Sequence, residues 1–263
     1  MTVKQKSPKR IVALFDQHYP HTIPAFWNHK TPKVLSPVFK FIRDFDPHII
    51  VHGGDQLDLG CVSHWNRGKP KLIEGKRLAD DYKGYNLLLD TLEKQTKSLE
   101  THTMLQGNHD YWIDMLVEEF PQAMEGMIEV QKNLNLASRG IKWVENGRTW
   151  NAGKLYFHHG DWKKGYLPEY HAKAIGMTFG KNMLYGHTHT EQAWTKVSPI
   201  DEHAIQTQCV GTLSNLNPAW MRNSPNAWVN SFWVGHILSN GNYYGHTVKI
   251  IGGEFMYDGQ LYK

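Results

Sequence analysis

Residues 49–58 read IIVHGGDQLD, an apolar run that is followed by two glycines and two carboxylates. The run predicts a buried strand over residues 48–52, which Gly53-Gly54 terminates. Asp55 then stands directly after the strand, and its two carboxylate oxygens can bridge two cations. Taken alone, a Gly-Asp pair is equally typical of an ordinary turn, so the rest of the chain must decide between the two interpretations.

Four more polar clusters follow predicted strands, both before and after this one. They are Asp16-Gln17-His18 after 10–16, Gly107-Asn108-His109-Asp110 after 101–106, His158-His159-Gly160-Asp161 after 154–158, and Gly186-His187-Thr188-His189 after 182–185. Each motif alone is weak or moderate evidence for metal, because such triplets and pairs also occur on ordinary surfaces. All five lie at strand ends, which is where α/β proteins place their sites. We therefore expect the clusters to meet.

Residues two apart in an extended chain point the same way. The spacing therefore predicts that Asp16 and His18 reach one metal together, and it places His187 and His189 on one side of an extended segment.

The order of predicted elements indicates an α/β fold. In the first half, strands alternate with helices over 36–45 and 73–99, which predicts parallel strands. The second half begins with helices over 112–119 and 121–136. It continues with a short helix over 168–179 and strands over 203–210, 228–238 and 243–251, and Asn146-Gly147 and Asn240-Gly241 are hairpin signals. We interpret residues 1–263 as one domain with two packed sheets flanked by helices.

Composition excludes several classes of protein. The chain has 263 residues, a net charge of +4 and only two cysteines, so neither a disulfide framework nor a thiolate metal cluster can form. No apolar run is long enough to span a membrane, and residues 11–15 are too short for a signal-peptide core. We therefore expect a cytoplasmic protein with no membrane partner. The charge permits an anionic substrate without requiring nucleic acid.

The five clusters, in this order, resemble the signature of the calcineurin-like metallophosphoesterase superfamily. The matching residues run from 16 to 189 as Asp-x-His, Gly-Asp-x-x-Asp, Gly-Asn-His-Asp, His-Gly and Gly-His-x-His. The whole chain most resembles phage-type members labelled DNA-repair exonucleases. The resemblance implies a four-layer αββα sandwich of two packed mixed β-sheets, with the active site at strand ends.

Carried onto this chain, the resemblance implies two divalent metal ions. The first would be held by Asp16, His18, Asp55 and His189, and the second by Asp55, Asn108, His159 and His187. Asp55 would bridge them. Nitrogen and oxygen donors suit Mn²⁺, Fe, Zn²⁺ or Ni²⁺, and the resemblance favours Mn²⁺. Two such cations activate water and stabilise both oxygens of an in-line displacement.

The resemblance also implies that His109 is the catalytic histidine outside the ligand set, and that Asp110 orients it. His109 could protonate the leaving oxygen or stabilise the phosphoryl oxygens. The fourth cluster departs from the family pattern, because Asp161 stands where a second histidine is frequent. His158 competes with His159 for the ligand role, and His159 is preferred because it directly precedes the glycine.

The substrate is the most open part of the sequence interpretation. Trp65, Arg67 and Lys69 lie in a loop after the second cluster, where they could stack a base and pair a phosphate; a solvated loop with one anchoring Trp fits equally well. The leading hypothesis is a phosphodiesterase that acts as a DNA nuclease, supported by the stretch 211–214, which matches a Gly-Ser-type loop of those nucleases.

Three other functions were weighed against the nuclease. A small-nucleotide phosphodiesterase or phosphatase is the main alternative, favoured by the modest charge. A non-catalytic scaffold is disfavoured because every ligand is retained. A protein phosphatase is disfavoured because Leu59 and Gln106 stand where those enzymes have arginine.

Overall fold

The computed structural model describes residues 7–19, 34–66, 68–162, 170–200, 204–218, 221 and 224–263. One sheet has six strands in the order β11-β10-β1-β2-β3-β4. Its strands are β1 Lys9–Leu14, β2 Ile49–His52, β3 Thr101–Leu105, β4 Ile141–Val144, β10 Ser231–Ile237 and β11 Tyr243–Lys249. The pairs β1–β2, β2–β3 and β3–β4 are parallel, as the alternation of strands and helices predicted.

The second sheet has five strands in the order β5-β6-β7-β9-β8. Its strands are β5 Trp150–Ala152, β6 Leu155–His158, β7 Met183–Tyr185, β8 Glu191–Val197 and β9 Ala204–Val210. The central pairs β6–β7 and β7–β9 are parallel, whereas β5 and β8 join antiparallel at the edges. Both sheets are therefore mixed.

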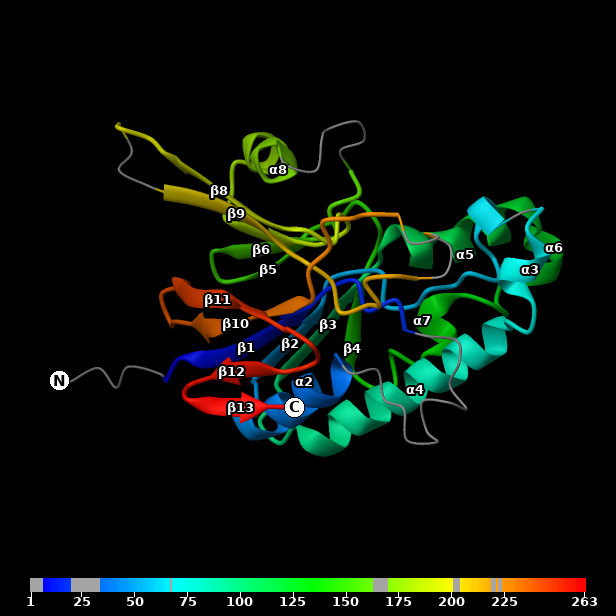
Figure 1. Cartoon of the computed structure of the whole chain (residues 1–263), viewed down its shortest axis with the longest axis horizontal. Helices are drawn as coiled ribbons and strands as arrows, with labels where there is room; N and C mark the ends of the chain where they lie inside the picture. The colour runs from blue at the N-terminus through cyan, green and yellow to red at the C-terminus, as the bar shows by residue number, and fades with distance from the viewer. Residues whose placement is uncertain are drawn as a thin grey trace.

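Helices cover the outer faces of the two sheets (Figure 1). On the six-stranded side lie α2 Leu35–Phe45 and α4 Leu78–Gln95, and on the five-stranded side lies α8 His171–Phe179. A C-terminal hairpin, β12 Phe255–Tyr257 with β13 Gln260–Tyr262, packs beside α2. The resulting order of layers is helix, sheet, sheet, helix, which confirms the αββα sandwich.

The central strand β1 shows why this chain forms layers. Its alternate residues enter different apolar cores: Val12 and Leu14 pack with the helices, whereas Ile11 and Ala13 pack between the two sheets. A strand that is covered on both faces must be apolar on both faces, and this explains the continuous run rather than an alternating one.

Two predicted helices are shorter in the structure than the sequence indicated. The helix expected over 73–99 is α4, and residues before it form the separate short helix α3 Pro70–Ile73. The helix expected over 121–136 is two short helices, α6 Pro121–Met124 and α7 Val130–Asn133. Gly75 and Gly126 lie between the pieces with φ of 74° and 80°, and this left-handed backbone ends a right-handed helix.

The two Asn-Gly signals have different outcomes. Asn240-Gly241 joins β10 to β11, which pair as the predicted hairpin. Asn146-Gly147 joins β4 to β5, and these strands belong to different sheets, so the predicted hairpin is wrong there. The sequence analysis also missed β4, β5, β8 and the β12–β13 hairpin. In addition, α5 Asn108–Glu119 begins four residues before the expected start at 112.

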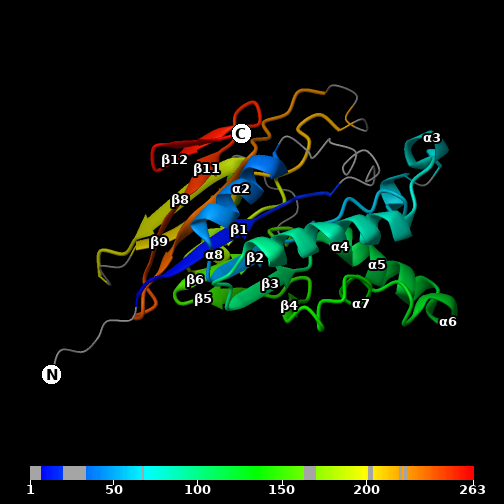
Figure 2. The same cartoon turned by 90° about the horizontal axis from the view of Figure 1, so that it is seen from below.

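Figure 2 shows the sandwich from below, with α5 and α6 Pro121–Met124 beside the far end of α4. The carboxyl ends of β1, β2 and β3 point towards this part of the molecule, as Figure 1 also shows. None of the described helices combines the length and the apolar character needed to cross a membrane.

Candidate metal centre

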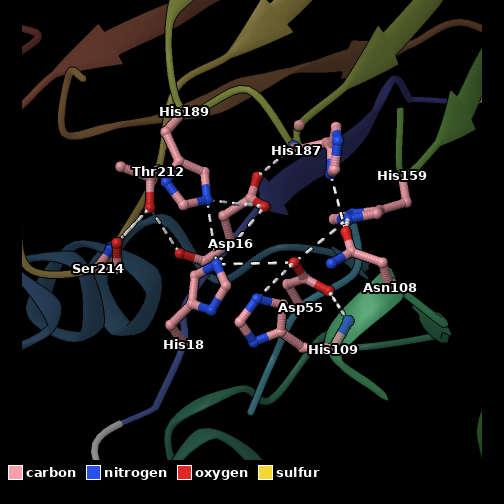
Figure 3. Close-up of polar contacts among 12 residues, drawn as sticks. Asp16, His18, Asp55, Asn108, His109, His159, His187, His189, Thr212 and Ser214 are labelled. Atoms are coloured by element: carbon pink, nitrogen blue, oxygen red, sulfur yellow. Dashed lines mark hydrogen bonds and ion pairs between the residues drawn. The ribbon is translucent and has the colours of Figure 1, made fainter. Parts of the chain in front are cut away.

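The five polar clusters meet where the parallel strands of both sheets end (Figure 3). β1, β2 and β3 supply three clusters from one sheet, and β6 and β7 supply two from the other. Eight of the predicted side chains lie around one centre: Asp16, His18, Asp55, Asn108, His109, His159, His187 and His189. Parallel strands end at a common edge, and this explains how clusters far apart in the sequence come together.

The first group consists of Asp16, His18 and His189, whose ligand atoms lie close enough to hold one ion. The Nε2 atoms of His18 and His189 face each other at 3.0 Å. Asp16 Oδ1 lies 3.3 Å from His189 Nε2 and 3.9 Å from His18 Nε2. This oxygen is buried, yet it accepts no hydrogen bond from any described residue.

The second group consists of Asn108, His159 and His187. Asn108 Oδ1 lies 3.0 Å from His159 Nε2 and 2.8 Å from His187 Nδ1. Asp55 completes the group, because its ligand oxygen lies within reach of the same two imidazoles. All these donors are nitrogen or oxygen, which suits a divalent first-row metal ion such as Mn²⁺ or Zn²⁺.

Asp55 lies between the two groups. Its Oδ2 is 3.7 Å from His18 Nε2 in the first group and 3.4 Å from His159 Nε2 in the second. Its Oδ1 accepts a hydrogen bond of 2.8 Å from the backbone N–H of His109, at the N-terminus of α5. The helix dipole and this N–H favour the ionised carboxylate. Asp55 therefore lies within reach of both groups.

The segments 16–18 and 187–189 are not extended, contrary to the prediction from their spacing. Asp16 and His18 have φ of 49° and 39°, and His187 and His189 have φ of 69° and 59°. Left-handed backbone turns the chain sharply at each position. As a result His189 lies in the first group and His187 lies beside His159 and Asp55 in the second.

Two glycines let the clusters approach one another. A Cβ on Gly107 would lie 2.1 Å from Asp55 Oδ1, and a Cβ on Gly186 would lie 2.1 Å from Asp16 Oδ2. Real side chains never approach so closely, so only glycine fits at either position. The glycines of the motifs thus make room for the carboxylates as well as for the turns.

Neighbouring backbone and hydroxyl groups hold the Asp16 loop. The N–H of Asp16 donates to the carbonyl of Gly54, and Asp16 Oδ2 accepts from the N–H of His187 at 2.8 Å. Thr212 Oγ1 donates to the Asp16 carbonyl at 2.7 Å and contacts Ser214 Oγ. The stretch 211–214 therefore lies beside the first group, as the sequence analysis expected.

His159, and not His158, faces the centre. His158 Nδ1 accepts from the N–H of Gly160 at 2.9 Å, and its ring packs against Phe179 of α8. His159 Nδ1 contacts the carbonyl of Gly53, which directs Nε2 towards Asn108 and Asp55.

Asp110 does not orient the His109 ring, contrary to the sequence prediction. Asp110 Oδ2 accepts from the backbone N–H groups of Asp55 and Gly107, which makes it the capping residue of α5. The His109 Nδ1 instead contacts the carbonyl oxygen of Asp58 at 2.8 Å. Asp58 is a contact that sequence reasoning missed, although it stands in the Gly-Asp-x-x-Asp motif.

The electrostatics of the centre are those of crowded, buried groups. Burial and the neighbouring His109 lower the pKa of His18 well below its ordinary value. Burial also lowers the pKa of His159, but the carboxylate of Asp55 outweighs this and raises it. Conversely, burial raises the pKa of Asp55, whereas His159 and His109 together hold it well below its usual range. Negative charge is therefore favoured where the two groups meet.

The predicted substrate residues lie on the short 3₁₀ helix η1 His64–Asn66 and just after it. The side chain of Trp65 is 68% exposed, and Lys69 Nζ donates to its carbonyl at 2.8 Å. The ring centroid of His64 lies 4.5 Å from that of Trp65 and 5.8 Å from that of Trp112. The ring centroid of Trp112 lies 3.9 Å from that of His109. A row of rings thus leads from His109 to the surface, and Arg67 lies outside the described residues.

Comparison with known proteins adds distant relatives. No protein-family model matches the chain. Two curated phage proteins do, each named Gene 54 protein: that of Mycobacterium phage L5 is 23% identical over 265 residues, covering 97% of this chain and 99% of the relative. That of Mycobacterium phage D29 is 24% identical with the same coverage. Both relatives are phage proteins, but neither name states an activity, so the exonuclease label finds no support there.

Three solved structures with a similar outline are remote in sequence. A metallophosphoesterase from Sphaerobacter thermophilus has 13% identity and a TM-score of 0.44, covering 93% of this chain and 89% of that one. Zinc-complexed Vps29 from Entamoeba histolytica has 13% identity and a TM-score of 0.43, covering 96% and 95%. Nuclease MPE from Pseudomonas putida has 13% identity and a TM-score of 0.35, covering 90% and 87%. The fold assignment rests on the strand order and layers described above, and the candidate site rests on its own geometry.

Proposed function

We propose that the protein is a metal-dependent phosphoesterase that uses two divalent cations. The observation that carries this proposal is the position of Asp55, whose Oδ2 lies within 3.7 Å of an imidazole in each group. Buried carboxylates and imidazoles are costly to bring together unless their polar atoms find partners. The unpartnered Asp16 Oδ1 fits a cation in the same way.

In this proposal Asp16, His18 and His189 would hold the first cation, Asn108, His159 and His187 would hold the second, and Asp55 would belong to both sites. Two such cations would supply charge stabilisation and water activation for phosphoester hydrolysis. The resemblance of the motifs to the metallophosphoesterases favours Mn²⁺, and Fe, Zn²⁺ and Ni²⁺ suit the same donors.

His109 acts on the substrate in this scheme. Its Nδ1–H donates to the Asp58 carbonyl, because a carbonyl oxygen can only accept. Its Nε2 then faces the centre, 4.0 Å from Asp55 Oδ2. From there it can give a proton to the leaving oxygen or stabilise a charged phosphoryl oxygen.

We further propose that the substrate is a nucleic acid and that the protein is a DNA nuclease. The row of rings from His109 through Trp112 and His64 to Trp65 supports this, because bases stack on exposed aromatic rings. Lys69 lies on the same turn. A nucleotide whose phosphate lies at the metals could then place a neighbouring base on Trp65.

A phosphodiesterase or phosphatase for small nucleotides is the second candidate. The modest net charge of +4 favours it, because proteins that follow a long phosphate backbone are usually more basic. Such an enzyme has the same two-metal chemistry and lacks only the need for a long substrate.

Two measurements test the two levels of the proposal separately. Hydrolysis of bis-p-nitrophenyl phosphate with added Mn²⁺ tests the chemistry, and no hydrolysis with any of the four metals would refute it. The kcat/KM for DNA substrates from two to about twenty nucleotides, at fixed salt, tests the nuclease. A rise with length supports it, whereas a flat profile leaves the small-nucleotide enzyme.

The role of Trp65 is tested by Trp65→Ala, which should weaken single-stranded DNA binding by about 1–3 kcal/mol. Tyr244→Ala is a matched control, because Tyr244 is similarly exposed, at 66%, but lies on β11. Equal losses in the two variants would contradict the stacking role, and hydrolysis of the small ester should not change in either.

A further inference from the structure

A chain of polar side chains lies buried directly beneath the first group. We call Gln17, His52, Tyr85 and His102 the polar network. The Tyr85 hydroxyl donates to Gln17 Oε1 at 2.5 Å and lies 3.0 Å from His52 Nδ1. His52 Nε2 lies 2.9 Å from His102 Nε2. Gln17, His52 and Tyr85 are at most 2% exposed and His102 is 6% exposed, so nearly all of the network is removed from solvent.

The hydrogen-bond roles in this chain are determined by the chemistry of its members. The single hydroxyl proton of Tyr85 is given to Gln17, so the Tyr85 oxygen must accept from His52 Nδ1–H. His52 Nε2 then accepts from His102 Nε2–H. In that arrangement the 3.4 Å contact between Gln17 Nε2 and His52 Nδ1 is not a hydrogen bond, because both atoms carry hydrogen.

Most of the surroundings of Tyr85 are apolar. Apolar side chains of the helix-side core, among them Leu88 and Leu89 of α4, pack around Tyr85. Burial, together with the neighbouring ring, lowers the pKa of His52 well below its ordinary value, which matches the neutral tautomers assigned above. Removing one member would leave its partners unsatisfied in an apolar core.

The network ends at the turn that carries two proposed ligands. Gln17 stands between Asp16 and His18, and both have left-handed backbone, which is strained for residues other than glycine. Such a conformation persists only where the surroundings hold it. Thr212 holds the Asp16 carbonyl on one side, and the Gln17 side chain reaches into the network on the other.

We propose that Tyr85, His52 and His102 are positioning residues, which fix the Gln17 side chain and thereby present Asp16 and His18 to the first cation. The proposal rests on the two-metal function above. Polar side chains buried in a core often stabilise the fold less than apolar side chains of similar volume would. A role in positioning the metal ligands would explain why these polar side chains are present.

The network is expected to act on one ion only. Gln17 lies in the loop of the first group, whereas Asn108 and His159 of the second group are held by α5 and by the Gly53 carbonyl. Loosening the Gln17 turn should therefore weaken the first cation and leave the second nearly unchanged.

The experiment is a titration of metal-free protein with Mn²⁺ by calorimetry, comparing wild type with Tyr85→Phe. Tyr82→Phe is the matched control: Tyr82 lies one turn earlier on α4 and donates a partly buried hydrogen bond of 2.5 Å to the Ile128 carbonyl. Tyr85→Phe should weaken one of the two ions by about 10–100-fold, as loss of groups that orient ligands does. Tyr82→Phe should weaken neither.

The identity of the weakened ion comes from a comparison with Asp16→Asn, which removes a proposed ligand of the first group. The ion lost in Asp16→Asn must be the one weakened in Tyr85→Phe. If Tyr85→Phe and Tyr82→Phe bind both ions as wild type does, the positioning role is refuted. If wild type itself binds fewer than two ions, the proposed function fails, and this outcome is distinct from the first.

A second variant keeps the test decisive if Tyr85→Phe does not fold. Gln17→Met retains the length of the side chain and removes both of its polar atoms. It should weaken the same ion to a similar degree. Where Tyr85→Phe does fold, the effects of the two changes should not add in the double variant, because both changes break the same link. Full additivity would mean that the two residues act independently and would overturn the proposal.

Discussion

The two ligand groups differ in how far their atoms satisfy one another without a metal. In the second group, Asn108 Oδ1 lies 3.0 Å from one imidazole nitrogen and 2.8 Å from another. In the first group, Asp16 Oδ1 is buried without a hydrogen bond from any described residue. A buried carboxylate oxygen without a donor gains most from a cation. We therefore expect the first group to bind a cation more tightly than the second group does.

The groups also differ in what holds them. The first depends on left-handed turns at Asp16, His18 and His189, each of which needs support from other elements. The second takes Asn108 from the first turn of α5, where the helix itself sets the side-chain direction. Of Asn108, His159 and His187 in the second group, His187 alone has left-handed backbone, so the first group depends more on support for such turns.

The largest effect is expected at Asp55, because it belongs to both groups. Asp55→Asn keeps the shape but removes the charge that offsets two divalent cations. We expect loss of at least one metal and of nearly all activity, with the fold retained. Metal content by mass spectrometry measures this, with Asp114→Asn as the control, since Asp114 accepts a hydrogen bond from Gln106 and belongs to neither ligand group. Two bound metals in Asp55→Asn would contradict the bridging role.

The next effect is expected at His109, which lies beside both groups but belongs to neither ligand set. His109→Asn should keep both metals and lower kcat by roughly 10²–10⁴-fold, the usual range for a general acid. The defect should shrink for a p-nitrophenyl ester, because a stable phenolate leaves without a proton. Loss of metal from this variant would show that His109 is a ligand instead.

A smaller and more selective effect separates the two groups directly. Asp16→Asn should weaken the first ion, and His187→Asn should weaken the second, each by at least about tenfold. If the first group binds more tightly, Asp16→Asn removes the high-affinity step of a Mn²⁺ titration, and His187→Asn removes the low-affinity step. If Asp16→Asn removes the low-affinity step instead, the second group binds its cation more tightly than the first.

The smallest effect is expected at Asp81, which should change the stability of the protein and leave metal binding unchanged. Burial, with the nearby Asp58, raises the pKa of this carboxyl to about 7. Between pH 4 and 7 the folded protein keeps a proton that the unfolded chain has lost, so the stability from Asp81 falls as pH rises. Asp81→Asn should gain roughly 2–3 kcal/mol relative to wild type between pH 5 and 8.

Urea unfolding of both proteins at the two pH values measures this gain, and both metal affinities should be unchanged. Equal pH dependence of the two proteins would mean that the Asp81 carboxyl is already ionised when folded.

Much of the fold and of the candidate site could be predicted, because short stretches of the sequence carry the signals for both. The apolar run before Asp55 and the glycines after it determine a buried strand and a tight turn, whatever surrounds them. The same local pattern repeats at each cluster, so the ligand candidates from Asp16 to His189 could be named from residue types and order. Helix lengths were harder, because Gly75 and Gly126 end helices only through a left-handed φ that sequence does not require.

The sequence by itself singled out the residues that meet at the candidate site, because strand ends, glycines and ligand residue types are local properties. Only the tertiary structure decided how each residue is used. In the structure Asp110 caps α5 and does not contact the ring of His109, contrary to what had been expected from the sequence. His159 faces the centre, whereas His158 does not. The tertiary structure also paired His52 with His102 beneath Gln17. These outcomes depend on contacts between residues up to about a hundred positions apart, as between His159 and Gly53, and such contacts exist only once the two sheets have packed.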